Sequence, residues 1–251
     1  MNKFFICVLL ATFHSSAQQT TTVSIDSTTL GRKLNFKYKQ LIIPAVFIGY
    51  GVFGLESGQI KGFNSGLSAE VTEDIDEKTS IDDFSQYLPL ASIYGLSMLG
   101  VKSKNNTKDK TIILATSYLL MGLTVTIFKK TTSVERPDGT SLNSFPSGHT
   151  ATAFMGAQLM YQEYKDVSVW YGISGFAVAA GTGAFRMYNN RHWLSDVVAG
   201  AGIGILSAKA GYWLFPYTSK LFTKKNSKNT KTAMIPFYDG KTIAFGFVKT
   251  F

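Results

Sequence analysis

Two uncharged apolar stretches, 111–128 and 167–185, limit the folds that are open to this chain. The first is about as long as the roughly 20 residues that a helix needs to cross a bilayer. The second is rich in Gly and Ala, which suits close packing between helices. A third apolar stretch, 194–215, carries three glycines at alternate positions (Gly200, Gly202 and Gly204). The sequence therefore predicts an all-α helical bundle that is a polytopic membrane protein.

The composition alone does not establish a membrane protein. Apolar residues make up 45% of the 251 residues, and mean hydropathy is only slightly positive, so the prediction depends on the individual stretches. The formal charge of +9 suits an anionic substrate or lipid headgroups. Nucleic acid is excluded as a partner because no basic stripe with interleaved aromatic residues is present.

Residues 1–17 have the pattern of a secretory signal peptide. Lys3 supplies the positive start, an apolar core extends to Phe13, and small residues end the segment at Ala17. An uncleaved membrane anchor is the alternative interpretation of the same residues. The only cysteine, Cys7, lies inside this segment, so the exported chain would form no disulfide.

The next segment, 18–83, is polar and acidic and contains one apolar run, 41–55. This run is short for a full crossing, and we interpret it as interfacial or re-entrant. Seven acidic residues lie towards the end of the segment without the regular spacing of a metal site. We interpret them as the solvated face of a loop or peripheral helix: Glu70, Glu73, Asp74, Asp76, Glu77, Asp82 and Asp83.

The remaining chain divides at residue 217. Residues 84–217 hold the apolar stretches and form the expected helical core, beginning with a helix over 84–101. Residues 218–251 are a basic tail that ends in two segments of alternating character. These segments flank Asp239-Gly240, a dipeptide typical of tight turns, and they predict a β-hairpin.

The residues that carry chemistry lie in three short blocks at the ends of apolar stretches. Outside residues 1–17 the chain has only two histidines, and both belong to these blocks. The blocks are Lys129-x6-Arg136-Pro137, then Pro146-Ser147-Gly148-His149, and finally Arg186-x5-His192-x3-Asp196.

The polar residues of these blocks suit a tetrahedral oxyanion. Arg136 and Arg186 offer planar forks to two oxygens, and Lys129 offers a point charge. Ser147 and Gly148 stand directly before an apolar helical run, where a hydroxyl and backbone N–H groups can face an anion. The sequence thus predicts a binding site for a phosphate group.

The histidines suit covalent catalysis at such a site. His192 and Asp196 are four residues apart and are expected on one helix face, where the carboxylate holds one ring nitrogen and leaves the other free to attack. His149 is then the general acid and base. This predicts hydrolysis of a phosphate monoester or diphosphate through a phosphohistidine. No metal or cofactor is expected, because clusters of metal-ligating residues are missing from the sequence.

The combined pattern resembles the type 2 phosphatidic acid phosphatase superfamily. That superfamily includes membrane lipid phosphatases, soluble bacterial class A acid phosphatases and vanadium haloperoxidases. The resemblance implies that phosphate is bound by Lys129, Arg136, Ser147, Gly148 and Arg186, with His149 as acid, His192 as nucleophile and Asp196 as its partner. Two departures are visible: Phe185 stands where the family has serine, and the link from Pro137 to Pro146 is short.

Each block also has a simpler interpretation. Lys129 and Arg136 could be interfacial anchors, His149 a capped core histidine, and His192 with Asp196 a structural pair. The occurrence of all three blocks in order favours the site. A membrane phosphatase acting on lipid phosphates or diphosphates is the first interpretation. A soluble periplasmic acid phosphatase, a vanadate-dependent haloperoxidase and a non-enzymatic headgroup binder are the others.

The order of the apolar stretches predicts an orientation. If each stretch crosses the membrane, all three blocks lie on one side, and the turns at 102–110 and 162–166 lie with the basic tail on the other. The positive-inside rule then places the blocks outside the cytoplasm, which predicts an inner-membrane protein with a periplasmic active site. With a cleaved signal, 41–55 and 84–101 must together make an odd number of crossings.

Overall fold

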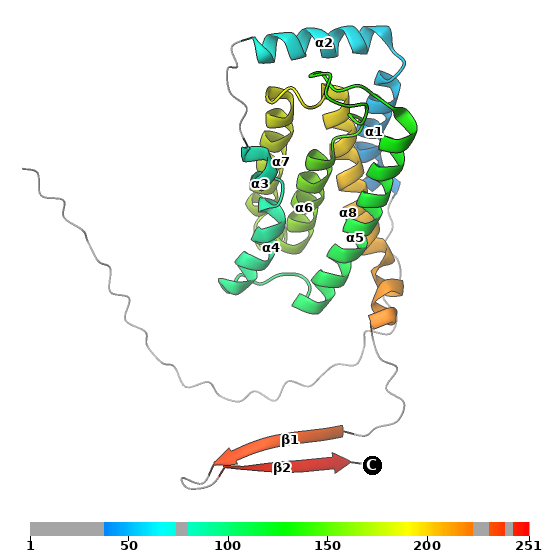
Figure 1. The fold of residues 1–251 in the computed structure, drawn as a ribbon. Coiled ribbons are helices and arrows are strands. Elements are labelled where there is room, and N and C mark those ends of the chain that lie inside the picture. Colours follow the sequence, from blue (N-terminus) through cyan, green and yellow to red (C-terminus); the bar gives the residue numbers. More distant parts are fainter. Residues whose placement is uncertain (1–37, 74–79, 223–230, 239–242, 251) are drawn as a thin grey trace, which may run out of the picture. The chain divides into compact units, whose positions relative to one another are not determined.

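The computed structural model describes residues 38–73, 80–222, 231–238 and 243–250 (Figure 1). The predicted signal peptide and the Asp239-Gly240 turn lie outside these residues. The described helices are η1 (Tyr38–Leu41, a 3-10 helix), α1 (Ile42–Gly54), α2 (Gly58–Thr72), α3 (Ile81–Ser85), α4 (Leu88–Met98), α5 (Thr107–Thr132), α6 (Gly148–Tyr164), α7 (Val169–Tyr188) and α8 (Leu194–Phe222).

The helices form a bundle around α6, as the sequence predicted. This helix packs against α7 and α8 most extensively and also contacts α4 and α5, while α8 packs in addition against α1 and α5 (Figure 1). Most residues of α6 are buried, among them Met155, Leu159 and Tyr164. Because α6 is central, its first turn is held in place from several sides.

Glycines permit the close approach of α8 to its neighbours. A Cβ atom at Gly200 would lie 2.5 Å from the Ser147 carbonyl oxygen, and one at Gly204 would lie 2.8 Å from the backbone nitrogen of Met155, both at α6. A Cβ at Gly202 would lie 2.9 Å from the carbonyl oxygen of Pro44 in α1. The predicted role of these glycines in close helix packing is confirmed, and it holds the start of α6 against α8.

Two of the described helices, α5 and α8, are long and apolar enough to cross a membrane. A third candidate span is present if η1–α1 and α2 are counted together as one broken span. The angle between these two segments is 93°. The helix α7 is not among these candidates. On α5, Leu119, Leu123 and Ile127 recur at every fourth residue and are exposed, so one apolar face of this helix points away from the bundle.

Two helix boundaries differ from the prediction. The expected helix over 84–101 is divided into α3 and α4, because Pro89 has no N–H and is accommodated in the first turn of a new helix. Lys129 was expected just beyond a helix but lies in the last turn of α5. That helix ends at Ser133, which has a left-handed backbone with φ of 46°.

The predicted hairpin is present in the tail. Strands β1 (Lys231–Tyr238) and β2 (Ile243–Thr250) pair antiparallel, and Tyr238 opposite Ile243 is the pair nearest the turn. The register follows from a four-residue connection between the strands, 239–242.

Candidate active site

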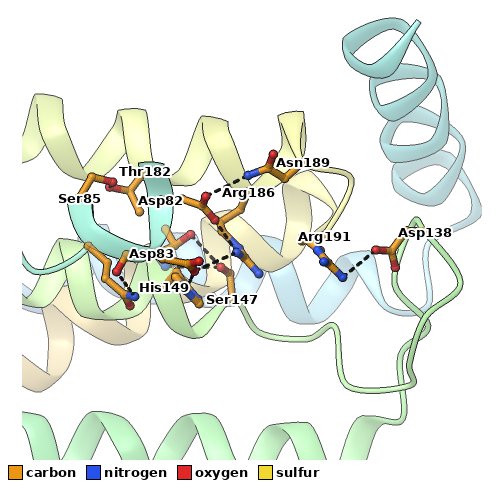
Figure 2. A network of polar contacts seen from close by, with 12 residues as sticks. Asp82, Asp83, Ser85, Asp138, Ser147, His149, Thr182, Arg186, Asn189 and Arg191 are labelled. Atoms are coloured by element: carbon orange, nitrogen blue, oxygen red, sulfur yellow. Dashed lines mark hydrogen bonds and ion pairs between the residues drawn. The ribbon is translucent and has the colours of Figure 1, made fainter. Parts of the chain in front are cut away.

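Three of the predicted phosphate-site residues face one cavity of about 390 Å³. Arg136 comes from the loop after α5. His149 comes from the first turn of α6 and Arg186 from the last turn of α7 (Figure 2). The complete lining consists of Ser80, Asp82, Asp83, Arg136, His149, Arg186, Asn189 and Arg191. The fold therefore brings together one residue from each of the three sequence blocks.

The first turn of α6 provides backbone donors. Ser147 is the N-cap residue, and its hydroxyl accepts from the backbone N–H of Thr150 at 3.4 Å. Its own backbone N–H donates to the carbonyl oxygen of Asp196 at 3.0 Å, which ties this turn to α8. Gly148 and His149 are the next two residues, and their N–H groups have no acceptor within the helix. These groups and the helix dipole favour an anion here.

The first block is held by one asparagine. Lys129 Nζ donates to the carbonyl oxygen of Asn143 at 2.5 Å, and Arg136 Nε donates to the Asn143 side chain at 3.1 Å. Burial and the nearby cations Arg186 and Arg191 lower the pKa of Arg136 from its usual value. Neighbouring guanidinium groups repel one another, and a bound oxyanion would offset this repulsion. The arrangement therefore suits an oxyanion.

His192 is almost completely buried, with 3% of its surface exposed. It lies in the segment before α8, not on the helix face shared with Asp196 that the spacing had predicted, because α8 begins only at Leu194. Its Nδ1 atom is nevertheless 3.6 Å from Asp196 Oδ2. This leaves Nε2 as the ring nitrogen that can attack.

Ser144 joins His192 to Asp196 and was not predicted. Its hydroxyl donates to Asp196 Oδ2 at 2.5 Å and lies 3.4 Å from His192 Nδ1. The backbone N–H of Trp193 also donates to Asp196 Oδ2, at 3.0 Å. Nothing in the sequence distinguished Ser144 from the other serines of this loop.

The environment keeps His192 neutral. Burial lowers its pKa to about 4, and the Asp196 carboxylate opposes this effect only in part. A neutral imidazole has a lone pair for attack on phosphorus at all pH values well above 4. Burial and the Arg186 cation also lower the pKa of His149 from 6.5, and its hydrogen bond with Asp83 opposes the decrease.

Two carboxylates on α3 face the site (Figure 2). Our interpretation of Asp82 as solvated was wrong, whereas Asp83 is exposed as expected but also contacts His149. Asp82 is 1% exposed and forms an ion pair with Arg186 Nη1, and its Oδ1 accepts from Asn189 Nδ2 at 2.9 Å. Asp83 Oδ1 lies 2.9 Å from His149 Nε2. The physical reason is that a guanidinium buried as deeply as Arg186 requires a counter-charge. The sequence signal was an acidic pair directly before an apolar helical run.

Arg186 retains a donor for a ligand. Its Nε atom is buried and has no hydrogen-bond partner among the residues that the structure describes. The Asp82 carboxylate contacts Nη1, so it orients the guanidinium without occupying every donor. Arg186 can thus hold its counter-ion and an oxyanion at once.

The group Asp82, Asp83 and His149 is the arrangement in the described chain that most resembles a metal site. One donor atom from each residue lies within 4.8 Å of the others. However, Asp82 is paired with Arg186, and Arg186 Nη1 is also 4.0 Å from Asp83 Oδ1. A guanidinium at this distance disfavours a divalent cation, so the residues fit a phosphate better than a metal.

Two contacts connect the loop before α6 to the segment that holds His192. Arg191 Nη1 lies 3.1 Å from Asp138 Oδ2 (Figure 2). Trp193 Nε1 donates to the carbonyl oxygen of Glu135 at 2.8 Å. Arg191 also lines the cavity. These contacts hold the first and third blocks at a fixed separation.

Within the helical bundle, a buried histidine close to Lys129 and Arg186 is an arrangement that suits covalent phosphate chemistry. Residues 110–220 match the sequence model of the PAP2 superfamily. This region contains all three blocks, so the family resemblance seen in the sequence is confirmed for residues 110–220.

Among curated proteins, the chain is similar to a lipid A 1-phosphatase of Porphyromonas gingivalis, with 43% identity over 154 residues. These residues are 61% of this chain and 35% of the relative. A bacitracin transport permease protein, BcrC, of Bacillus licheniformis is 36% identical over 77 residues, which are 31% of this chain and 36% of the relative. The chain thus spans about a third of the length of each of these curated relatives.

Among solved structures, the fold is similar to that of a transmembrane PAP2-type phosphatidylglycerolphosphate phosphatase from Bacillus subtilis. The TM-score is 0.53 with 18% sequence identity, and the match covers 76% of this chain and 100% of the other. At this level of identity the similarity concerns the fold. It agrees with the predicted helical bundle.

Proposed function

We propose that this chain is a membrane phosphatase that hydrolyses lipid phosphate monoesters or diphosphates through a phosphohistidine. The observation that carries the proposal is the meeting of Arg136, His149 and Arg186 at one cavity. The buried His192 does not line this cavity, but it is close enough to Arg186 for that cation to help lower its pKa. A non-enzymatic headgroup site would need the cations, but not a buried imidazole with an oriented ring. The two candidate spans, α5 and α8, favour a membrane substrate over a soluble phosphomonoester.

In the first step, the lone pair of His192 Nε2 forms a bond to phosphorus as the bond to the leaving oxygen breaks. His149 gives its proton to that oxygen. The Asp196 carboxylate and the Ser144 hydroxyl hold Nδ1 and stabilise the positive charge that develops on the ring. The guanidinium of Arg186 and the backbone N–H groups at the start of α6 neutralise charge on the equatorial oxygens.

In the second step, water replaces the histidine. His149, now neutral, accepts a proton from the attacking water, and the bond between phosphorus and His192 Nε2 breaks. Phosphate leaves, and both histidines return to their starting protonation states. The same residue thus serves as acid in the first step and base in the second, so loss of His149 slows both.

The similarity to a lipid A 1-phosphatase favours a glycolipid phosphate of that type as the substrate. We place the site on the periplasmic face of the bacterial inner membrane. Lys102, Lys104 and Lys108 lie before or at the start of α5, and Lys165 and Lys220 lie at the ends of α6 and α8. These basic residues are at the helix ends opposite the site, which fits the positive-inside rule.

A substrate panel tests this function. Detergent-purified protein is assayed for phosphate release from lipid A, phosphatidic acid, phosphatidylglycerol phosphate, undecaprenyl diphosphate and glycerol phosphate, with His192→Ala as the control. We expect release from at least one lipid and little from glycerol phosphate. A water-soluble phosphate ester added to spheroplasts tests the periplasmic orientation. Preference for glycerol phosphate, or release from no substrate, would reject the proposal.

The pKa shifts predict an acidic optimum for kcat/KM. His192 must be neutral, and activity is therefore expected to rise as pH increases through about 4. His149 must be protonated, and its pKa lies below 6.5, so activity is expected to fall before neutral pH. The measurement is a kcat/KM profile from pH 3 to 9, with pH values set at about half-unit steps. His149→Gln should remove the alkaline decrease that comes from the enzyme, and an alkaline optimum would contradict the assignment.

A further inference from the structure

We infer that Asp83 is a positioning residue that holds His149 in its proton-donating form, and that the enzyme needs it for substrates with poor leaving groups. This inference rests on the proposed phosphatase function. It starts from the 2.9 Å contact between Asp83 Oδ1 and His149 Nε2, which joins α3 to the first turn of α6. No residue of α3 belongs to the three sequence blocks.

The position of Asp83 is fixed by its neighbours on α3. Asp82, the preceding residue, anchors the helix to α7 through Arg186 and Asn189. Two residues after Asp83, the Ser85 hydroxyl lies 2.8 Å from Thr182 Oγ1, also on α7 (Figure 2). A carboxylate between two such anchors is presented to His149 in a defined direction.

The contact determines which ring nitrogen acts. With Nε2–H donating to Asp83, the ring of His149 presents Nδ1–H to the leaving oxygen. When the bond between phosphorus and oxygen breaks, Nδ1 gives up its proton and Nε2–H remains with the carboxylate. The ring then has a free lone pair on Nδ1, which can accept a proton from water in the second step.

The charges around His149 show why a carboxylate is needed. His149 faces Arg186 from α7 and Asp82 and Asp83 from α3. Burial and the Arg186 cation both favour the neutral ring, which cannot donate two hydrogen bonds. Asp83 is the carboxylate that is hydrogen-bonded to the His149 ring, and it favours the protonated form of that ring. Asp82 is engaged mainly by Arg186.

A competing role is that Asp83 blocks the site. Its side chain is 56% exposed and lies 4.0 Å from Arg186 Nη1, so it could compete with phosphate for the guanidinium. The two roles predict opposite effects of one variant. Removal of a blocking carboxylate would raise activity, whereas removal of a positioning carboxylate lowers activity on substrates with poor leaving groups.

The test compares two phosphate esters that differ in their need for an acid. Asp83→Asn is assayed in detergent on p-nitrophenyl phosphate, whose leaving group departs without a proton, and on a lipid alkyl phosphate that the wild type hydrolyses. We expect kcat/KM on the alkyl phosphate to fall roughly 10–100-fold, a part of the full effect of a general acid. On the nitrophenyl ester we expect kcat/KM to fall less than about threefold, because kcat/KM reports the first step, which needs little acid catalysis with this leaving group.

Three comparisons make the result specific. Asp83→Glu retains a carboxylate and should recover part of the alkyl phosphate activity. Asp138→Asn removes a carboxylate that contacts the cavity residue Arg191 and should leave the ratio between the two substrates unchanged. In Asp83→Asn, the alkaline limb of the kcat/KM profile should move to lower pH, because the group that raises the pKa of His149 is gone.

Equal losses on both esters, or a gain in activity, would overturn the inference. Since Asp83 is more than half exposed, the variant should fold, and its thermal unfolding midpoint is measured alongside. Failure of the wild type on every phosphate ester would instead reject the proposed function, so the two failures are distinguishable.

Discussion

His192→Ala is expected to lower kcat for phosphate release by about 10⁴-fold or more. In the proposed mechanism the variant removes the atom that forms the covalent bond. Neither other histidine is expected to replace it, since His149 acts as the acid and His14 lies in the predicted signal peptide. Because His192 is buried beside Asp196 and Ser144, alanine leaves a small cavity but keeps the backbone segment. Steady-state phosphate release from the best lipid of the panel measures the effect.

Trapping of the covalent intermediate shows whether His192 is the nucleophile or a structural histidine. Wild-type protein quenched in alkali after mixing with labelled substrate should carry acid-labile, alkali-stable label on histidine. His149→Ala should accumulate more of this label from an activated ester, because water attack then lacks its base. His192→Ala should carry none. Label that persists in His192→Ala would show that another residue is phosphorylated, and the proposed roles would have to be reassigned.

The sequence was informative where chemistry requires particular residue types at particular spacings. The bundle followed from uncharged apolar stretches, and the glycines of α8 followed from the need for close contact between helices. Arg136, His149 and Arg186 could be predicted to share a site because each stands at the end of an apolar stretch on the same side. Such patterns are local, and the topology of the bundle brings them together.

The missed residues act through tertiary contacts that have no local pattern. Asp82 meets Arg186 across more than a hundred residues of sequence, and Ser144 meets Asp196 across about fifty. An acidic residue in a polar segment is usually solvated, so the burial of Asp82 could be inferred only after Arg186 was known to be buried. Likewise, the spacing of His192 and Asp196 predicted that the two side chains are close, which they are. The predicted cause, a shared helix face, was wrong because His192 lies before the start of α8.

The largest effect on stability is expected for Asp82→Ala. Arg186 would be left as a buried cation, 7% exposed, without the carboxylate that now contacts it. Breaking a buried ion pair from one side typically costs about 3–5 kcal/mol. For a chain of this size that corresponds to a decrease of roughly 6–20 °C in the thermal unfolding midpoint. Asp83→Ala on the same helix is the matched control, and we expect a cost below about 1 kcal/mol because its side chain is largely exposed.

A double variant separates the structural part of this pair from its part in phosphate binding. Asp82→Leu combined with Arg186→Met replaces both charges with apolar side chains, and such replacements are often neutral for stability. We expect the unfolding midpoint to return most of the way to that of the wild type. Phosphate release should nevertheless stay at least about 10²-fold below wild type, because the guanidinium that faces the equatorial oxygens is gone. Recovery of stability together with activity would show that Arg186 serves the fold alone, and that the oxyanion is held by the remaining cations of the cavity.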